Sequence, residues 1–94
     1  MYGATKVAVV GLARGWTRDL GPRGVLVNVI QPGPIDTDLN PADARDEAVA
    51  MRKMTALGRY GRTDAIASLA AFLAGNAASF ITGAEIDIDG GFSI

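Results

Sequence analysis

The chain has 94 residues, no cysteine, no histidine and a formal net charge of -1. Without cysteine there is no disulfide framework or thiolate metal site, and without histidine there is no imidazole ligand or base, so we expect no metal centre. Nine basic against ten acidic residues would not attract nucleic acid or an anionic membrane, and no apolar run approaches the roughly 20 residues of a membrane span. We expect a cytoplasmic protein that binds neither nucleic acid nor membrane.

The apolar content is high but contains few aromatic side chains. Hydrophobic residues make up 49% of the chain and aromatic residues only 6%. Such a composition describes a core of Ala, Val, Ile and Leu that packs against further protein. We therefore expect the chain to be part of a larger domain.

Tyr2 and Lys6 open a helix predicted from about residue 3 to residue 20. A spacing of four residues places both side chains on one helical face. A phenol titrates near about 10, so it needs a nearby positive charge before it can exchange protons at neutral pH. The pair therefore predicts general acid–base chemistry, with Lys6 lowering the pKa of Tyr2. The alternative is an ordinary surface pair, because this spacing recurs on many amphipathic helices.

A stripe of small side chains runs along the opposite side of this helix. Glycine inside a helix costs about 1 kcal/mol relative to alanine, so a stripe with two glycines predicts the close approach of another helix. The alternative is simple tolerance of small residues. The stripe consists of Ala4, Ala8, Gly11 and Gly15. Gly21-Pro22 is expected to end the helix, with Gly21 in the left-handed conformation.

Residues 25–31 form a nearly unbroken apolar run between Gly24 and Pro32, which predicts a parallel strand covered on both faces. Asn28 interrupts the run. We favour a role for Asn28 in bracing the adjacent backbone over a direct catalytic role, because most buried polar groups are simply satisfied by hydrogen bonds. Pro32-Gly33-Pro34 then forces a turn at the carboxyl end of the strand, where ligands bind in open α/β sheets.

Helix-capping residues predict the second and third helices, and an alternation of polar and apolar residues predicts the second strand. Asn40-Pro41 predicts the start of a second helix that continues to about residue 57. Thr63-Asp64 predicts the start of a third helix, which runs to about residue 74 before Gly75. Residues 85–88 alternate polar and apolar, which predicts a strand with one apolar face, and the Asp-Gly-Gly run at 89–91 predicts a turn.

Four motifs occur in a fixed order: the Tyr2–Lys6 pair, residues 27–33, residues 35–37, and residues 81–83 with 89–91. Together they resemble the short-chain dehydrogenase/reductase family, especially bacterial reductases similar to 3-oxoacyl-carrier-protein reductase. The resemblance implies an α/β fold, the C-terminal part of a Rossmann-like doubly wound parallel sheet, with two parallel strands and about three helices here. Residues 1–94 would form the C-terminal half of a single domain. The N-terminal cofactor-binding half, with its glycine-rich loop and catalytic Ser, would precede them.

The resemblance also implies roles for individual residues. Tyr2 would be the general acid or base, and Lys6 would lower its pKa and hydrogen-bond the nicotinamide ribose. The Ile35 backbone would meet the nicotinamide carboxamide, and the Thr37 hydroxyl would bond the cofactor near its carboxamide or pyrophosphate. The cofactor would be NADP or NAD, with NADP favoured. The full set of predicted cofactor-binding residues is Tyr2, Lys6, Pro32, Gly33, Ile35 and Thr37.

The function implied is that of an oxidoreductase that interconverts a small-molecule carbonyl and an alcohol by hydride transfer. Met51 and Met54 lie in the segment that covers the substrate in the resembled family, although methionines at helical spacing are more often core residues. The resembled proteins pair their equivalent helices across subunits, so a homodimer or homotetramer is expected. We expect the 94-residue chain alone to be inactive. The alternatives are a non-catalytic protein that binds a nucleotide or signalling ligand on the same scaffold, and an inert truncation product.

Overall fold

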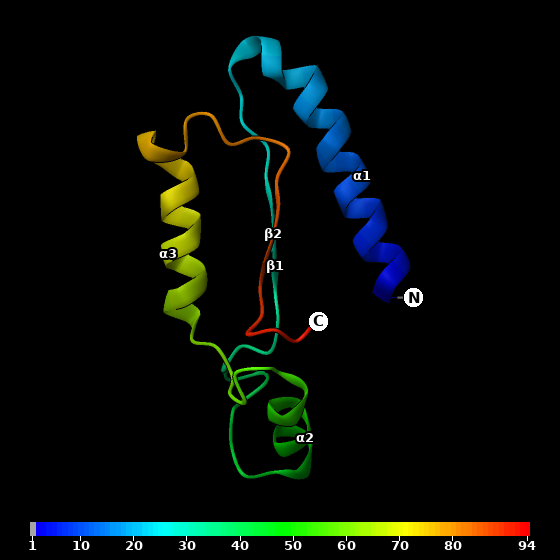
Figure 1. The fold of residues 1–94 in the computed structure, drawn as a ribbon, viewed down its shortest axis with the longest axis vertical. Helices are drawn as coiled ribbons and strands as arrows, with labels where there is room; N and C mark the ends of the chain where they lie inside the picture. Colours follow the sequence, from blue (N-terminus) through cyan, green and yellow to red (C-terminus); the bar gives the residue numbers. More distant parts are fainter. Residues whose placement is uncertain (1) are drawn as a thin grey trace. The chain divides into compact units, whose positions relative to one another are not determined.

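The computed structural model describes residues 2–94, with side chains from Ala4 onward. These residues form three α-helices and a two-stranded sheet, as predicted, with two short 3-10 helices (Figure 1). In chain order the elements are α1 (Tyr2–Leu20), η1 (Gly21–Arg23), β1 (Val29–Pro32), α2 (Asp46–Met54), α3 (Thr63–Ala74), η2 (Asn76–Ala78) and β2 (Glu85–Ile88). They divide into two compact units, a first of Met1–Ile30 with Phe72–Ile86 and a second of Gln31–Ala71 with Asp87–Ile94.

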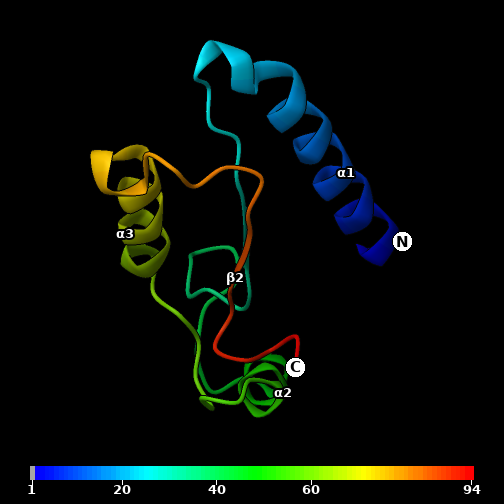
Figure 2. The same ribbon diagram turned by 45° about the horizontal axis from the view of Figure 1, so that its top comes forward.

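Helix α1 ends at Leu20 as predicted, but the chain reverses later than expected. Gly21 begins the 3-10 turn η1, and Gly24 takes the left-handed conformation with a φ of 75° (cyan in Figure 2). The prediction that Gly21 would be the left-handed residue is therefore wrong. Pro22 explains the difference, because a proline in the first turn of a helix lacks an N–H that would have no helical partner there. The helical path can thus continue for one more turn.

The two strands run parallel. The Val29 N–H donates to the Ala84 carbonyl at 2.9 Å and the Gly33 N–H donates to the Ile88 carbonyl at 3.2 Å, so both strands advance in the same direction. Strand β2 has the predicted bounds and the predicted alternation. Its two isoleucines are half-buried, whereas its two carboxylates are exposed.

The first strand begins four residues later than predicted. Before Val29, side chains form hydrogen bonds with backbone groups of the opposite segment. The Asn28 amide donates to the Ile81 carbonyl at 3.1 Å, and its oxygen accepts from the Ala84 N–H at 3.0 Å. The Thr82 hydroxyl oxygen accepts from the Val27 N–H at 3.0 Å. A regular backbone ladder therefore cannot form there. The predicted bracing role of Asn28 is confirmed.

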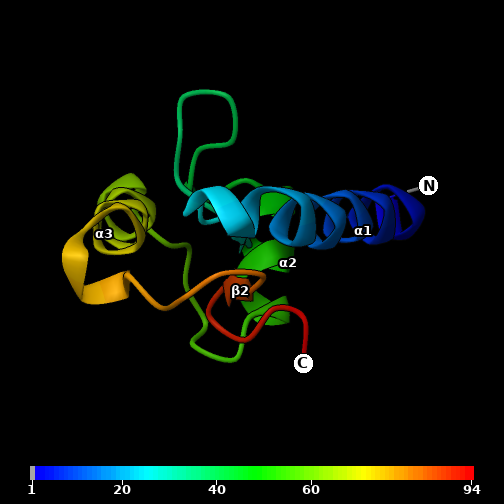
Figure 3. The same ribbon diagram turned by 90° about the horizontal axis from the view of Figure 1, so that it is seen from above.

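The second helix does not begin at Asn40, and that prediction is wrong. Helix α2 begins at Asp46, because side chains before it bind the backbone N–H groups that a helix would need. The Thr37 hydroxyl oxygen accepts from the Asn40 N–H at 3.1 Å, and an Asp36 carboxylate oxygen accepts from the Ala42 N–H at 2.8 Å. Thr37 and Asn40 form an antiparallel bridge that closes a tight turn. The turn belongs to the connection between β1 and α2, drawn in green in Figure 3.

Helix α3 has the predicted bounds. Its least exposed side chains are Ile66, Leu69 and Leu73, whose spacing of three and four residues places them on one face of the helix. Gly75 follows the helix in an extended conformation, with a φ of -93°, and its N–H donates to the Phe72 carbonyl at 3.1 Å. Gly75 therefore ends α3 without a left-handed cap.

Few side chains are buried among those that the structure describes. The buried apolar residues are small apart from one tyrosine: Ala13, Ala48, Tyr60 and Ala78. In contrast, Val7, Leu12 and Trp16 of α1 are 73%, 56% and 53% exposed. An apolar surface of this size on one helix predicts a contact with further protein.

Candidate cofactor and catalytic site

The predicted catalytic pair occupies the first turns of α1. The Tyr2 backbone starts the helix, which confirms that Tyr2 and Lys6 stand one turn apart. The Tyr2 side chain lies outside the described side chains. Lys6 is half-buried and lines a cavity of about 320 Å³ together with Val10 and Glu85. Lys6 thus borders an open cavity beside the helix.

The Pro32-Gly33-Pro34 turn leaves the carboxyl end of β1 within the second unit. Gly33 lies against the start of the C-terminal turn, because a Cβ at Gly33 would lie 2.5 Å from the Cβ of Asp89 and 2.7 Å from its Cα. Real Cβ atoms do not approach other atoms so closely. A side chain at position 33 would therefore push the turn away from Asp89. The predicted turn is confirmed, and its glycine is required by packing.

Ile35 follows this turn, and its own backbone N–H and C=O point away from Gly61, the residue with which it pairs. It forms a parallel bridge with Gly61, in which the Pro34 carbonyl accepts from the Gly61 N–H and the Asp36 N–H donates to the Gly61 carbonyl, both at 2.9 Å. In a parallel bridge the central residue points its own N–H and C=O the opposite way. Within residues 2–94 neither group of Ile35 has a hydrogen-bond partner. Ile35 thus offers one donor and one acceptor side by side.

Thr37 lies two residues further along the loop. Its N–H donates to the Asn40 carbonyl at 3.3 Å, and its hydroxyl oxygen accepts from the Asn40 N–H. The hydroxyl proton can still be donated outward, because a hydroxyl has one donor and two acceptor positions. Pro32, Gly33, Ile35 and Thr37 all belong to the second unit, whereas Tyr2 and Lys6 belong to the first.

The sequence predictions missed the central role of Asp89. One carboxylate oxygen accepts from the Gly91 N–H at 2.9 Å, and the other accepts from the Ser93 N–H at 3.2 Å and the Ser93 hydroxyl at 2.6 Å. The Ser93 hydroxyl is the main cause that holds the pKa of Asp89 below its usual value, and the backbone N–H groups act in the same direction. The sequence signal was an Asp followed by two glycines, with Ser93 four residues after the Asp, since Asp readily bonds nearby backbone.

The C-terminal turn is also held by the segment after α2. The Leu57 N–H donates to the Gly90 carbonyl at 3.0 Å, and a Cβ at Gly91 would lie 2.5 Å from the Cβ of Ala56. Figure 2 shows the C-terminal residues in red beside α2. A small cavity of about 140 Å³ remains between this turn, the residues after β1 and the residues after α2. The second unit therefore fixes the loop after β1 through its own C-terminal residues.

Among residues 2–94, no three side chains of the metal-binding kinds gather into a group that could hold a metal ion. No helix in the described part of the chain has the length and apolar character needed to cross a membrane.

Comparison with known proteins identifies the scaffold. Residues 1–93 match the family model described as enoyl-(acyl carrier protein) reductase. A cyclic-di-GMP-binding biofilm dispersal mediator protein of Escherichia coli is 50% identical over 93 residues, and the 3-oxoacyl-[acyl-carrier-protein] reductase FabG of Salmonella typhimurium is 38% identical over 90 residues. These alignments cover 97% and 96% of this chain but only 38% and 37% of the relatives.

Solved structures agree with these relatives. A short-chain dehydrogenase/reductase from Serratia marcescens matches 99% of this chain and 38% of its own, with a TM-score of 0.93 and 50% identity. A blue fluorescent protein from a metagenomic library, solved in complex with NADPH, matches 100% of this chain and 38% of its own, with a TM-score of 0.92 and 46% identity. The Rossmann-like fold class is thereby confirmed.

Proposed function

This chain belongs to the short-chain dehydrogenase/reductase family, and we propose that it supplies the C-terminal half of an NAD(P)-dependent oxidoreductase that interconverts a carbonyl and an alcohol. An N-terminal half with the glycine-rich loop and the catalytic Ser would complete the domain. The chain spans little more than a third of the length of its relatives, which fits a partial domain.

The backbone of Ile35 is the observation that carries this proposal. A carboxamide has an NH₂ donor and a carbonyl acceptor, which match the outward C=O and N–H of Ile35. Gly61 anchors the residues on both sides of Ile35, so the pair is held in place before a ligand arrives. Such a rigid donor–acceptor pair at the carboxyl end of β1 fits the nicotinamide carboxamide. NADP is favoured over NAD because the metagenomic neighbour was solved with NADPH.

The catalytic chemistry is assigned to the start of α1. Bound nicotinamide would supply or accept the hydride. Tyr2 would donate a proton to the carbonyl oxygen during reduction, or remove it from the hydroxyl in the reverse direction. Lys6 would lower the pKa of the Tyr2 phenol through its positive charge and hydrogen-bond the nicotinamide ribose. Both positions share one helix, so the proton donor and the cofactor anchor would keep a fixed spacing.

The substrate would be a small carbonyl compound or alcohol that helix α2 covers. Met54 of α2 is 58% exposed, so the helix offers pliable apolar surface. The separation of α2 from β1 by a loop of hydrogen-bonded turns supports a covering role, because such segments commonly close over bound substrate.

A chimaera tests this function. The matched segment of the Salmonella typhimurium reductase is replaced by this chain, and NADPH-dependent reduction of a 3-oxoacyl substrate is followed. Tyr2→Phe should lower kcat by about 10²–10⁴-fold with NADPH affinity nearly unchanged, since it removes only the transferable proton. Lys6→Ala should lower kcat and also weaken NADPH binding. Equal and modest effects of the two changes, with NADPH affinity unaltered in both, would refute these roles.

One finding favours a second candidate function. The Escherichia coli relative at 50% identity is named for binding cyclic di-GMP and not for an enzymatic reaction. We propose, as the alternative, that the complete protein binds a signalling nucleotide without turnover. Fold alone does not decide between the two, because one scaffold can serve both. Binding of cyclic di-GMP by a chimaera that lacks reductase activity would favour the second function.

The complete protein is proposed to be a homodimer or homotetramer. Gly11 and Gly15 of α1 have no atom within 4 Å of an added Cβ, apart from the helix's own neighbouring backbone. The same helix exposes Val7, Leu12 and Trp16. Small residues beside exposed apolar side chains suit the close packing of a helix from a second subunit.

A further inference from the structure

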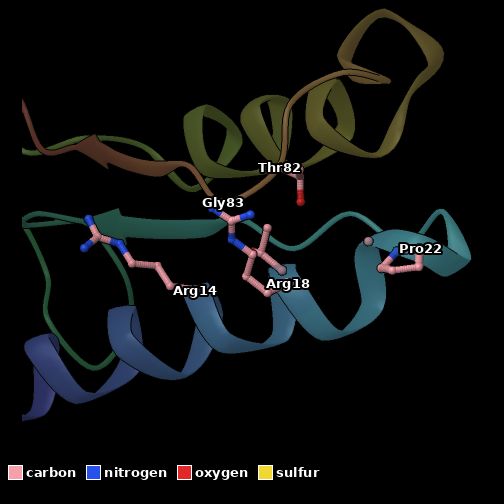
Figure 4. Close-up of a pocket in the computed structure, with 7 residues that line it drawn as sticks. Arg14, Arg18, Pro22, Thr82 and Gly83 are labelled. Atoms are coloured by element: carbon pink, nitrogen blue, oxygen red, sulfur yellow. The ribbon is translucent and has the colours of Figure 1, made fainter.

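Two arginines of α1 border an open cavity that the proposed hydride transfer does not use. The cavity has a volume of about 670 Å³, lies within the first unit, and is bordered by Arg14, Thr17, Arg18, Gly21, Pro22, Thr82 and Gly83. We name it the arginine cleft. Figure 4 shows the Arg18 side chain extending from α1 toward Gly83, whereas the Arg14 side chain, one turn earlier on the same helix, extends toward the strands and away from Thr82.

The two guanidinium groups are available to a ligand. In the described part of the chain neither guanidinium group forms an ion pair or a side-chain hydrogen bond. No carboxylate is among the residues that border the cleft. Glu85 borders the adjoining 320 Å³ cavity together with Arg14 and Lys6, and Asp19 follows Arg18 in the sequence. The border of the arginine cleft itself therefore carries two positive charges and no carboxylate, which favours an anion.

The opposite wall of the cleft is fixed and polar. The Thr82 hydroxyl oxygen accepts from the Val27 N–H at 3.0 Å, which holds the side chain and leaves its proton free to be donated. Gly83 has a φ of 75°, and an added Cβ would lie 3.3 Å from a Thr17 methyl carbon. The wall is therefore formed by residues that hydrogen bonds and packing hold in place.

The dimensions indicate a ligand larger than a simple anion. Arg14 and Arg18 stand one helical turn apart, about 6 Å, so their planar guanidiniums can each contact a separate phosphoryl group of one molecule. A volume of about 670 Å³ lies in the range of small-molecule and cofactor sites, roughly 300–1,000 Å³, and exceeds what one phosphate would fill. We propose that the arginine cleft binds the two phosphoryl groups of a dinucleotide.

This assignment goes beyond hydride transfer and holds for either proposed function. Two sources of a dinucleotide can be distinguished experimentally, namely a cyclic dinucleotide and a nicotinamide dinucleotide. If the ligand is cyclic di-GMP, the cleft supplies the site for the second candidate function. If it is NADPH, the cleft holds a molecule in addition to the one proposed for the loop after β1.

Equilibrium titration of the full chain tests the proposal, with cyclic di-GMP, NADPH and pyrophosphate as separate probes. At least one dinucleotide should bind, and the Gly83 amide resonance should shift on binding. The double variant Arg14→Gln/Arg18→Gln should weaken that binding by about 100-fold, since each charge-assisted contact is worth at least about tenfold. The control Arg52→Gln/Lys53→Gln removes the same charge from α2 and should change the affinity less than threefold.

Four outcomes would overturn the proposal. They are the absence of binding by both dinucleotides, binding of pyrophosphate alone, equal losses in the arginine double variant and the control, and binding that leaves the Gly83 amide unshifted. Thr82→Ser and Thr82→Val add a local check that keeps the charge constant. Serine should retain the affinity and valine should reduce it severalfold, because only serine keeps the hydroxyl. Circular dichroism of each variant verifies that the fold is intact.

Discussion

The glycines of α1 and those of the second unit are used in opposite ways. Gly11 and Gly15 have open space around an added Cβ, whereas a Cβ at Gly33, Gly61 or Gly91 would lie under 3.0 Å from a neighbouring atom. At these three positions of the second unit, glycine is explained by contacts inside this chain. At Gly11 and Gly15 no contact within the described residues requires glycine, and the proposed contact with a second subunit would supply a reason. The comparison thus separates glycines that packing within the chain requires from glycines that are proposed to serve assembly. Each of the substitutions below tests this separation.

Gly33→Ala should have the largest effect on stability. Its Cβ would meet both the Cβ and the Cα of Asp89, and backbone atoms cannot rotate away. Overpacking at such a place costs about 1–3 kcal/mol, and we expect the upper end of that range. Urea unfolding of the chain measures the loss, and NADPH affinity of the chimaera should fall with it. A stable Gly33→Ala variant would show that the loop after β1 is not fixed by Asp89.

Gly91→Ala should lower the stability of the chain nearly as much as Gly33→Ala does, and a second substitution should restore part of that stability. Gly91 has a φ of 84°, which strains any other residue, and the added Cβ would meet the Cβ of Ala56. Ala56→Gly removes that contact and leaves the strain. In a double-mutant cycle the pair should therefore recover about 1–2 kcal/mol of the loss. Additive losses in the cycle would contradict the contact.

Gly61→Ala should have a smaller effect. The added Cβ would meet only the Cδ1 atom of Ile35, at 2.9 Å, and the tip of an isoleucine can move. We expect a loss of about 1 kcal/mol. Ile35→Val removes that atom and should restore the stability of Gly61→Ala while retaining the backbone of Ile35. Failure of Ile35→Val to restore it would place the clash elsewhere.

In the isolated chain, Gly11→Ala should raise the stability, whereas the three substitutions above should lower it. With nothing near the added Cβ, alanine gains helix propensity, and the stability of α1 should rise by about 0.5–1 kcal/mol.

In the complete protein, Gly11→Leu should dissociate or precipitate the oligomer, because a large side chain would enter a close helix contact. Sedimentation velocity of Gly11→Leu beside the parent tests this. An unchanged oligomer with unchanged activity would remove the assembly explanation.

The pH dependence of the second unit should be the mildest effect. The folded pKa of Asp89 is lowered, mainly by the Ser93 hydroxyl, while its unfolded pKa is about 3.9. The stability that Asp89 contributes is therefore fully present above that value and is lost as the pH falls through the lower folded pKa. Asp89→Asn should flatten this part of the pH–stability curve. A curve unchanged by Asp89→Asn would assign the acid loss to other carboxylates, such as Asp43, whose pKa is also lowered by its contacts with Arg45.

Local patterns predicted the elements that depend on local signals. Helix α3 and strand β2 have the predicted bounds, because the residue types at the ends of α3 and the strict alternation of β2 are signals that lie within a few residues. The start of β1 and the start of α2 were wrong because Asn28, Asp36 and Thr37 bind backbone groups with their side chains. Such competition depends on conformation, and the residue types alone do not reveal it.

The same limit applies to the candidate site. The turn at Gly33 was predictable from Pro-Gly-Pro after an apolar strand. Its packing partner Asp89 lies 56 positions away in the sequence, so no local pattern links the two. Likewise, the outward backbone of Ile35 depends on its bridge to Gly61, which only the folded chain brings together. The role of Ile35 came from the family resemblance, and the bridge now supplies a physical reason for it.

The transfer of labelled hydrogen tests the proposed function most directly. The chimaera of the Salmonella typhimurium reductase with this chain is supplied with NADPH that carries deuterium at C4 of the nicotinamide, and the alcohol product is analysed by mass spectrometry. Our account predicts deuterium on the carbinol carbon, and product formation reduced by about 10²–10⁴-fold in the Tyr2→Phe chimaera. A chimaera that binds NADPH but forms no deuterated alcohol, or one in which Tyr2→Phe retains full transfer, would contradict it.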